Sequence, residues 1–133
     1  MNNLDTFIKS VISLVSNKNQ FVEGFMIPHQ CQQLIEFLHE HPEIQTIAET
    51  GFNVGMSSAA MLSVRPTIKI WSFDLVQYNY VLGQKHLIDE LFPSRHTLII
   101  GDTMQTLPNF NIAAKDNLFD FVFIDGGSYC SCS

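Results

Sequence analysis

Four short apolar runs, each followed by an acidic residue, constrain the fold of this chain more than any other feature. The runs cover residues 44–48, 68–73, 97–100 and 119–124, and the acids after them are Glu49, Asp74, Asp102 and Asp125. Segments with helical periodicity separate the runs. Strands that alternate with helices form βαβ units, whose right-handed crossovers give a parallel sheet. Nearly continuous apolar strands are typical of a sheet that is covered on both faces.

The intervening segments predict the rest of the architecture. Helices are expected at residues 4–16, from Pro28 to His39, and at 57–64 and 80–92, with a short helix or loop at 104–114. The predicted fold class is α/β, a partial doubly wound, Rossmann-like parallel sheet in three αβα layers, preceded by two N-terminal helices. We expect one domain over residues 1–133, with the N-terminal helices in 1–43, the core in 44–127 and an irregular tail in 128–133.

Composition excludes several function classes. The 133 residues are 46% hydrophobic and 15% charged, which suits a packed core, and the formal net charge of −6 disfavours nucleic acid as a partner. No apolar run reaches the length of about 18 residues that a membrane span needs, and residues 1–18 lack the features of a signal peptide. Three cysteines without a framework spacing indicate a reducing compartment, so the cytoplasm is expected.

The four acids are predicted to meet at one edge of the sheet. In an open parallel sheet, ligands bind outside the carboxyl ends of the strands. A single acid after a strand commonly caps a helix or forms a turn, but four of four at this edge indicate a binding site. The loop after the first run also holds Gly51 and Gly55, which allow positive φ and close approach of a ligand. The helix that follows presents free N–H groups to an anion.

Two common nucleotide-binding patterns are absent from this loop. A dinucleotide fingerprint that starts at Gly51 would need glycine at positions 53 and 56, where Asn53 and Met56 stand. A phosphate-binding P-loop would need a lysine, and none occurs between Lys18 and Lys69. Glu49 at the mouth of the loop would also repel a pyrophosphate. The pattern therefore favours a ligand without phosphate groups.

S-adenosylmethionine meets these requirements, because it carries an ammonium group, a sulfonium group and one carboxylate. Glu49 suits its cationic end, and N–H groups near Met56 and Ser57 suit its carboxylate. Asp74 follows Gly55 by 19 residues, about where an acid at the end of a second strand accepts from ribose hydroxyls. The adjacent side chain of Leu75 is placed to pack on the adenine.

The same residues resemble a known family. The segment from Glu49 to Ser57 resembles the first motif of class I S-adenosylmethionine-dependent methyltransferases with an E-x-G-x-x-x-G-x-S loop. Phe73-Asp74, Gly101-Asp102 and residues 119–127 resemble the second, third and fourth motifs, so the likeness covers residues 44–127. It implies that the cofactor lies across the first four strands. Its contacts are then expected from Glu49, Gly51, Phe52, Asn53, Gly55, Met56, Ser57, Asp74, Leu75, Asp102, Thr103 and Asp125.

The likeness ends after Gly127. Related O-methyltransferase-like proteins continue D-G-G-H-S-Y, then a helix and three more strands, whereas here Ser128 and Tyr129 follow directly and the sequence soon ends. No catalytic residue can therefore be assigned. Where relatives use a metal, Asp125 would be its first ligand, but the later ligands are missing and no metal is expected.

The predicted function is O-methyl transfer from S-adenosylmethionine to a small molecule, by a chain that is incomplete at its C-terminus and has little activity alone. The alternatives are a non-catalytic remnant that only binds the cofactor, an interaction protein with an exposed sheet edge, and an oxidoreductase, which the glycine pattern disfavours. A homodimer through the strand at 119–124 is expected. His96 is interpreted as structural, and Tyr80 either lines the cofactor pocket or covers the sheet.

Overall fold

The computed structural model describes residues 2–16, 28–76, 79–101 and 119–124. The elements in chain order are α1 (Asn3–Val15), α2 (Pro28–Glu40), β1 (Thr46–Thr50), α3 (Met56–Leu62), β2 (Lys69–Asp74), α4 (Tyr80–Leu91), β3 (His96–Ile100) and β4 (Phe121–Ile124). The predicted α/β class and its two N-terminal helices are confirmed. The segment expected as a short helix or loop at 104–114 lies outside the described residues. No described helix has the length and apolar character that crossing a bilayer requires.

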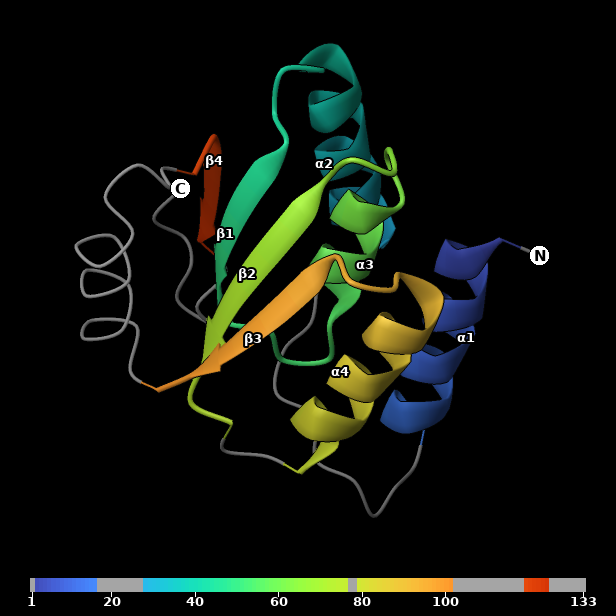
Figure 1. Ribbon diagram of the computed structural model, residues 1–133. Coiled ribbons are helices and arrows are strands. Elements are labelled where there is room, and N and C mark those ends of the chain that lie inside the picture. The colour runs from blue at the N-terminus through green and yellow to red at the C-terminus, as the bar shows by residue number, and fades with distance from the viewer. Residues whose placement is uncertain (1, 17–27, 77–78, 102–118, 125–133) are drawn as a thin grey trace.

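The described strands form one parallel sheet in the order β3-β2-β1-β4. The chain moves outward from β1 through β2 to β3, and then returns to place β4 on the other side of β1. The direction of winding therefore reverses between β1 and β4, which is where open α/β sheets bind their ligands. All strand carboxyl ends lie at the lower edge of the sheet in Figure 1.

The four described helices cover one face of the sheet (Figure 1). Their apolar residues recur at helical spacing and meet the inward side chains of the strands, so that Phe7, Leu38, Ile47, Met61 and Ile88 are fully buried. Phe73 is also fully buried, although strand alternation places it on the opposite face of the sheet. Burial on both faces agrees with the continuous apolar character of the strands.

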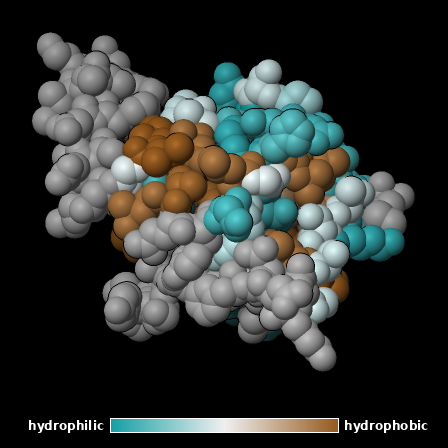
Figure 2. Space-filling view, turned by 90° about the horizontal axis from the view of Figure 1, so that it is seen from below, coloured by the Kyte–Doolittle hydropathy of each residue, from teal (hydrophilic) through white to brown (hydrophobic). Residues whose placement is uncertain are grey.

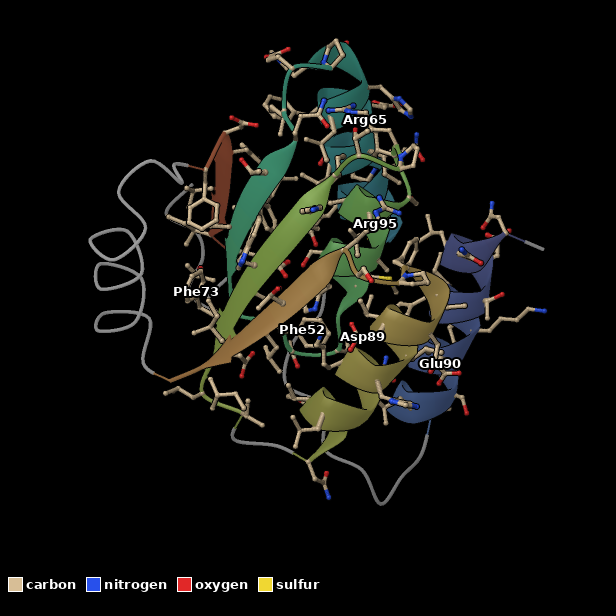
Figure 3. The ribbon with its side chains drawn as sticks, viewed as in Figure 1. Phe52, Arg65, Phe73, Asp89, Glu90 and Arg95 are labelled. Carbon is tan, nitrogen blue, oxygen red and sulfur yellow. The ribbon has the colours of Figure 1, made fainter. Side chains whose placement is uncertain are left out.

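Two arginines hold the amino edge of the sheet together (Figure 3). The Arg65 guanidinium donates from Nη1 to the carbonyl of Leu38 at 2.9 Å, near the end of α2. Arg95 donates from Nη2 to the carbonyl of Leu62 at 2.7 Å, at the end of α3, and burial lowers its pKa. Cations are favoured at helix C-termini, where carbonyls lack intrahelical partners. Because α3 ends at this edge, its N-terminus lies at the opposite, carboxyl edge.

The first strand begins two residues later than the apolar run predicts. The amide of Ile44 bonds to the carbonyl of His41 in a turn, and the pairing of β1 with β2 starts only at Thr46. Asp120 fixes this start, because its Oδ2 accepts the amides of Gln45 at 2.8 Å and Thr46 at 3.1 Å. These bonds lower the pKa of Asp120. The shift places Glu49 inside the strand.

Candidate functional site

The loop at residues 51–55 turns the chain sharply from β1 into α3. Gly51, Asn53 and Gly55 have φ values of 86°, 52° and 84°, in the left-handed region that glycine and asparagine tolerate best. The Gly51 amide donates to the carbonyl of Phe73 at 2.7 Å, and the Gly55 amide donates to the carbonyl of Phe52 at 2.8 Å. The residue types of the predicted motif are therefore those that this turn requires.

Asp74, at the end of β2, binds this loop. Its Oδ2 accepts the backbone amides of Phe52 at 2.7 Å and Asn53 at 3.0 Å, and its Oδ1 accepts the amide of Val76 at 2.7 Å. An ionised carboxylate has about four lone-pair positions, so acceptor capacity is left for one ligand hydroxyl. The structure thus brings together two of the predicted site segments, and it shows that Asp74 orders the loop.

Helix α4 supports the loop from the helix side. The Tyr80 hydroxyl donates to Oδ1 of Asn53 at 2.8 Å, and Nε2 of Gln84 donates to the carbonyl of Val54 at 2.9 Å. Ser10 on α1 donates to Oε1 of Gln84 at 3.3 Å. Tyr80 is buried and therefore acts as a support for the loop. Gln84 was missed by sequence reasoning, because a single glutamine on an amphipathic helix gives no signal.

Core side chains explain the small residue at position 55. A Cβ placed on Gly55 would lie 2.7 Å from Cζ of Phe52 and 2.9 Å from Cζ of Phe7. The Phe52 ring lies between the sheet and the helices (Figure 3), with its centroid 5.1 Å from that of the His96 ring. The positive φ expected for this glycine is confirmed, and close packing of the core is a second reason for it. Any contact of Phe52 with a cofactor would involve its backbone.

Glu49 lies in a buried polar cluster. Its carboxylate, which is 0% exposed, accepts the hydroxyls of Ser57 and Ser58 on α3 and that of Ser72 on β2, the last at 2.7 Å. The register places Glu49 directly beside Ser72. The expectation that Glu49 presents its charge at the exposed rim is thus wrong for the side chain, which points toward α3. Ser57 is likewise buried with its hydroxyl turned inward.

His96 extends the cluster to β3. Its Nε2 lies 2.8 Å from Oγ of Ser72, and its backbone carbonyl accepts Nζ of Lys85 at 2.8 Å. Burial, and then the charge of Lys85, lower the pKa of His96 to about 3. The imidazole is therefore neutral at physiological pH. Its position at the start of β3 agrees with the interpretation of His96 as a structural residue.

The carboxyl edge of the sheet presents apolar surface beside the loop (Figure 2). Leu75 after β2, Ile100 at the end of β3 and Ile124 at the end of β4 are 55%, 59% and 61% exposed. Such a surface can hold a flat apolar ring next to the Asp74 carboxylate. Met56, which was also predicted to contact the cofactor, is buried. Asp102, Thr103 and Asp125 lie outside the described residues, and within the described ranges no three His, Cys, Asp or Glu side chains form a metal-binding group.

No family model and no curated protein matches the chain. Solved structures do share its fold. The O-methyltransferase TomG from Streptomyces achromogenes, which is involved in tomaymycin synthesis and was solved with S-adenosylmethionine, aligns with a TM-score of 0.67 and 15% identity, over 94% of this chain and 53% of that chain. Cofactor-bound Rv0187 from MTB aligns with a TM-score of 0.67 and 16% identity, over 92% of this chain and 52% of that chain. The Podospora anserina methyltransferase PaMTH1 with bound S-adenosylhomocysteine aligns with a TM-score of 0.62 and 20% identity, over 76% of this chain and 42% of that chain.

The chain thus spans about half the length of the solved structures that it matches. At these identities the likeness concerns the fold, and the chain has the Rossmann-like fold of S-adenosylmethionine-dependent methyltransferases. The described sheet corresponds to the part of that fold on both sides of the β1–β4 reversal.

Proposed function

We propose that this chain binds S-adenosylmethionine at the carboxyl edge of its sheet and belongs to a methyltransferase that methylates a small-molecule hydroxyl. The observation that carries the proposal is the bond between Asp74 and the loop at 51–55, at the reversal of the sheet. This arrangement leaves an acceptor position on Asp74 for a ribose hydroxyl. The bound cofactor would supply the methyl group as an electrophile.

The distribution of charge supports a ligand without phosphate. The described cations nearest the sheet stand at or next to its amino edge, opposite the loop; they are Arg65, Lys69, Lys85 and Arg95. Beside the loop at the carboxyl edge, the ionisable side chain is the carboxyl group of Asp74. A pyrophosphate would need basic or amide donors there without nearby acids. The exposed Leu75 and Ile100 beside Asp74 suit the adenine ring.

The chain's own residues would bind and orient the cofactor. Asp74 would accept from the ribose, the backbone at Gly51 would lie against the methionine part, and Leu75 would pack on the adenine. Of the predicted contacts, Glu49, Phe52, Met56 and Ser57 have buried side chains, so their contribution would come from the backbone or from a distance. Asp102, Thr103 and Asp125 keep their predicted roles.

Titration calorimetry tests the proposal. We expect saturable binding of S-adenosylmethionine and S-adenosylhomocysteine and none of NAD. Binding of NAD alone would favour the oxidoreductase, and binding of none of the three would refute the proposed cofactor site. For the acceptor, the chain should be assayed with a panel of hydroxylated small molecules, alone and together with the C-terminal half of a structurally similar methyltransferase. We expect little turnover by the chain alone, because its fold spans about half of such proteins.

A further inference from the structure

The side chain of Asp74 fills a position that the glycine loop would otherwise offer to an anion. The amides of Phe52 and Asn53 converge on its Oδ2, at 2.7 Å and 3.0 Å. A backbone amide can only donate, so the direction of both bonds is fixed by the chemistry of the groups. Successive amides that point at one atom form the concavity in which other loops bind phosphate groups. Here the protein fills that concavity with its own oxygen.

Asp74 is also held in this position from its other side. Its Oδ1 accepts the amide of Val76 at 2.7 Å, in a tight turn within residues 74–76. Its backbone carbonyl accepts the amide of Gly101 at 2.9 Å, which fixes the end of β2 to the end of β3. A phosphate that sought the two loop amides would therefore have to displace a side chain that three hydrogen bonds hold in place.

The other amides of the loop offer no replacement. Those of Gly51 and Gly55 donate to backbone carbonyls of the protein, at 2.7 Å and 2.8 Å. Val54, the remaining residue of the loop, is buried. The hydrogen-bonding capacity left beside the loop is thus acceptor capacity, on the oxygens of Asp74. Such a site favours a ligand hydroxyl, which donates, over a phosphate, which mainly accepts.

We propose that Asp74 closes the glycine loop to phosphate groups by occupying its amides, and so determines the ligand class that the site admits. This inference rests on the proposed function, because it names what the cofactor site rejects. The proposed exclusion comes from the occupied amides, and repulsion by the charge of the acid would be a different mechanism. Removal of the side chain should therefore do more than weaken the site for its own ligand. It should open the loop to a ligand of another class.

The test uses inorganic phosphate as its probe and compares three variants. Asp74→Ala frees both amides. Asp74→Asn removes the charge but keeps one oxygen that can accept from both amides. Glu90→Ala removes an exposed carboxylate on α4 and so matches the change in net charge. The amide NMR signals of Phe52 and Asn53 are followed at pH 7 while phosphate replaces chloride at constant ionic strength.

We expect Asp74→Ala to bind phosphate about ten- to hundredfold more tightly than the wild-type chain, the size expected for new hydrogen bonds to a charged group. The largest shifts should occur at the amides of Phe52 and Asn53. Asp74→Asn and Glu90→Ala should stay close to the wild type. Phosphate should also raise the thermal stability of Asp74→Ala, because a ligand that binds only the folded chain stabilises it. This second measurement serves if the variant is poorly folded in chloride.

Three results would overturn the inference. If Asp74→Ala gains no phosphate binding, or stays unfolded even in phosphate, the acid only orders the loop. If Asp74→Asn gains as much as Asp74→Ala, the exclusion is due to charge and not to occupied amides. If Glu90→Ala gains as much, the effect is one of net charge. None of these experiments contains the cofactor, so a wild-type chain that binds no S-adenosylmethionine would refute the proposed function separately.

Discussion

The Asp74 carboxylate accepts the backbone amide of Phe52 at 2.7 Å, across 22 positions of sequence. The end of β2 thereby fixes the loop that follows β1. A loop that is already ordered loses less conformational entropy when a ligand binds. In the proposed site, Asp74 would therefore contribute to binding in two ways, as a direct acceptor and as a support for the glycine loop.

Replacement of Asp74 by alanine should weaken binding of S-adenosylmethionine by about 1.5–3 kcal/mol, as expected for a lost charge-assisted hydrogen bond. It should also speed hydrogen exchange of the Phe52 and Asn53 amides in the ligand-free protein, because both lose their acceptor. Glu90→Ala is the matched control, since it removes an exposed carboxylate that contacts His86 on the surface of α4 (Figure 3). Unchanged binding in Asp74→Ala would contradict the role of this carboxylate.

The two glycines at positions 55 and 83 should respond to alanine in opposite ways. Gly55→Ala forces a side chain into a φ of +84° and brings its Cβ to 2.7 Å from the Phe52 ring. We therefore expect the free energy of unfolding to fall by about 1–3 kcal/mol. Gly83 lies in α4, where a Cβ would meet nothing within 4 Å, and Gly83→Ala should stabilise by about 0.4–1 kcal/mol. Denaturant unfolding measures both. Equal effects would show that the packing around Gly55 is misjudged.

The architecture could be predicted from the sequence because it depends on periodicity. The described helices and strands lie within about two residues of their expected bounds, since apolar spacing decides which residues the core takes. The direction of the Glu49 side chain could not be predicted in this way. An apolar run that seemed to end at position 48 placed Glu49 in the loop, whereas pairing that starts at Thr46 keeps it in the strand. Strand alternation then puts it on the same face as Ile47, toward α3.

The partners within the site were also hidden from the sequence. Ser58, Ser72 and His96 come from three different elements. The register of the sheet places Ser72 beside Glu49, the packing of α3 brings Ser58 to it, and His96 contacts Ser72. The positive φ of Gly55 could be expected from the motif, whereas its close packing against Phe52 and against Phe7, from a helix about fifty residues away, could not. Motifs predict residue types at a turn, and the three-dimensional packing decides what those residues contact.

His96 should make stability depend on pH. Its folded pKa of about 3 lies below the value of 6.5 for an unfolded histidine, so the unfolded chain takes up a proton first as the pH falls. The contribution is complete above about pH 6.5 and decreases toward pH 3, by about 2 kcal/mol at pH 5. His96→Gln should remove this part of the slope in unfolding experiments between pH 7 and 5. The exposed His86→Gln should leave it intact, and a wild-type slope in His96→Gln would contradict a buried neutral imidazole.

The edge of the sheet at β4 should cause copies of the chain to associate. Among the described residues, β4 pairs only with β1, and its side chains Val122 and Ile124 are 46% and 61% exposed, whereas Phe121 and Phe123 pack partly toward the helices. An apolar strand edge invites pairing with another chain. We expect light scattering to detect dimers or larger species that grow with concentration, and Val122→Lys together with Ile124→Lys to suppress them. Leu82→Lys, at an exposed position of α4, controls for added charge. A monodisperse wild-type monomer at high concentration would contradict association through β4.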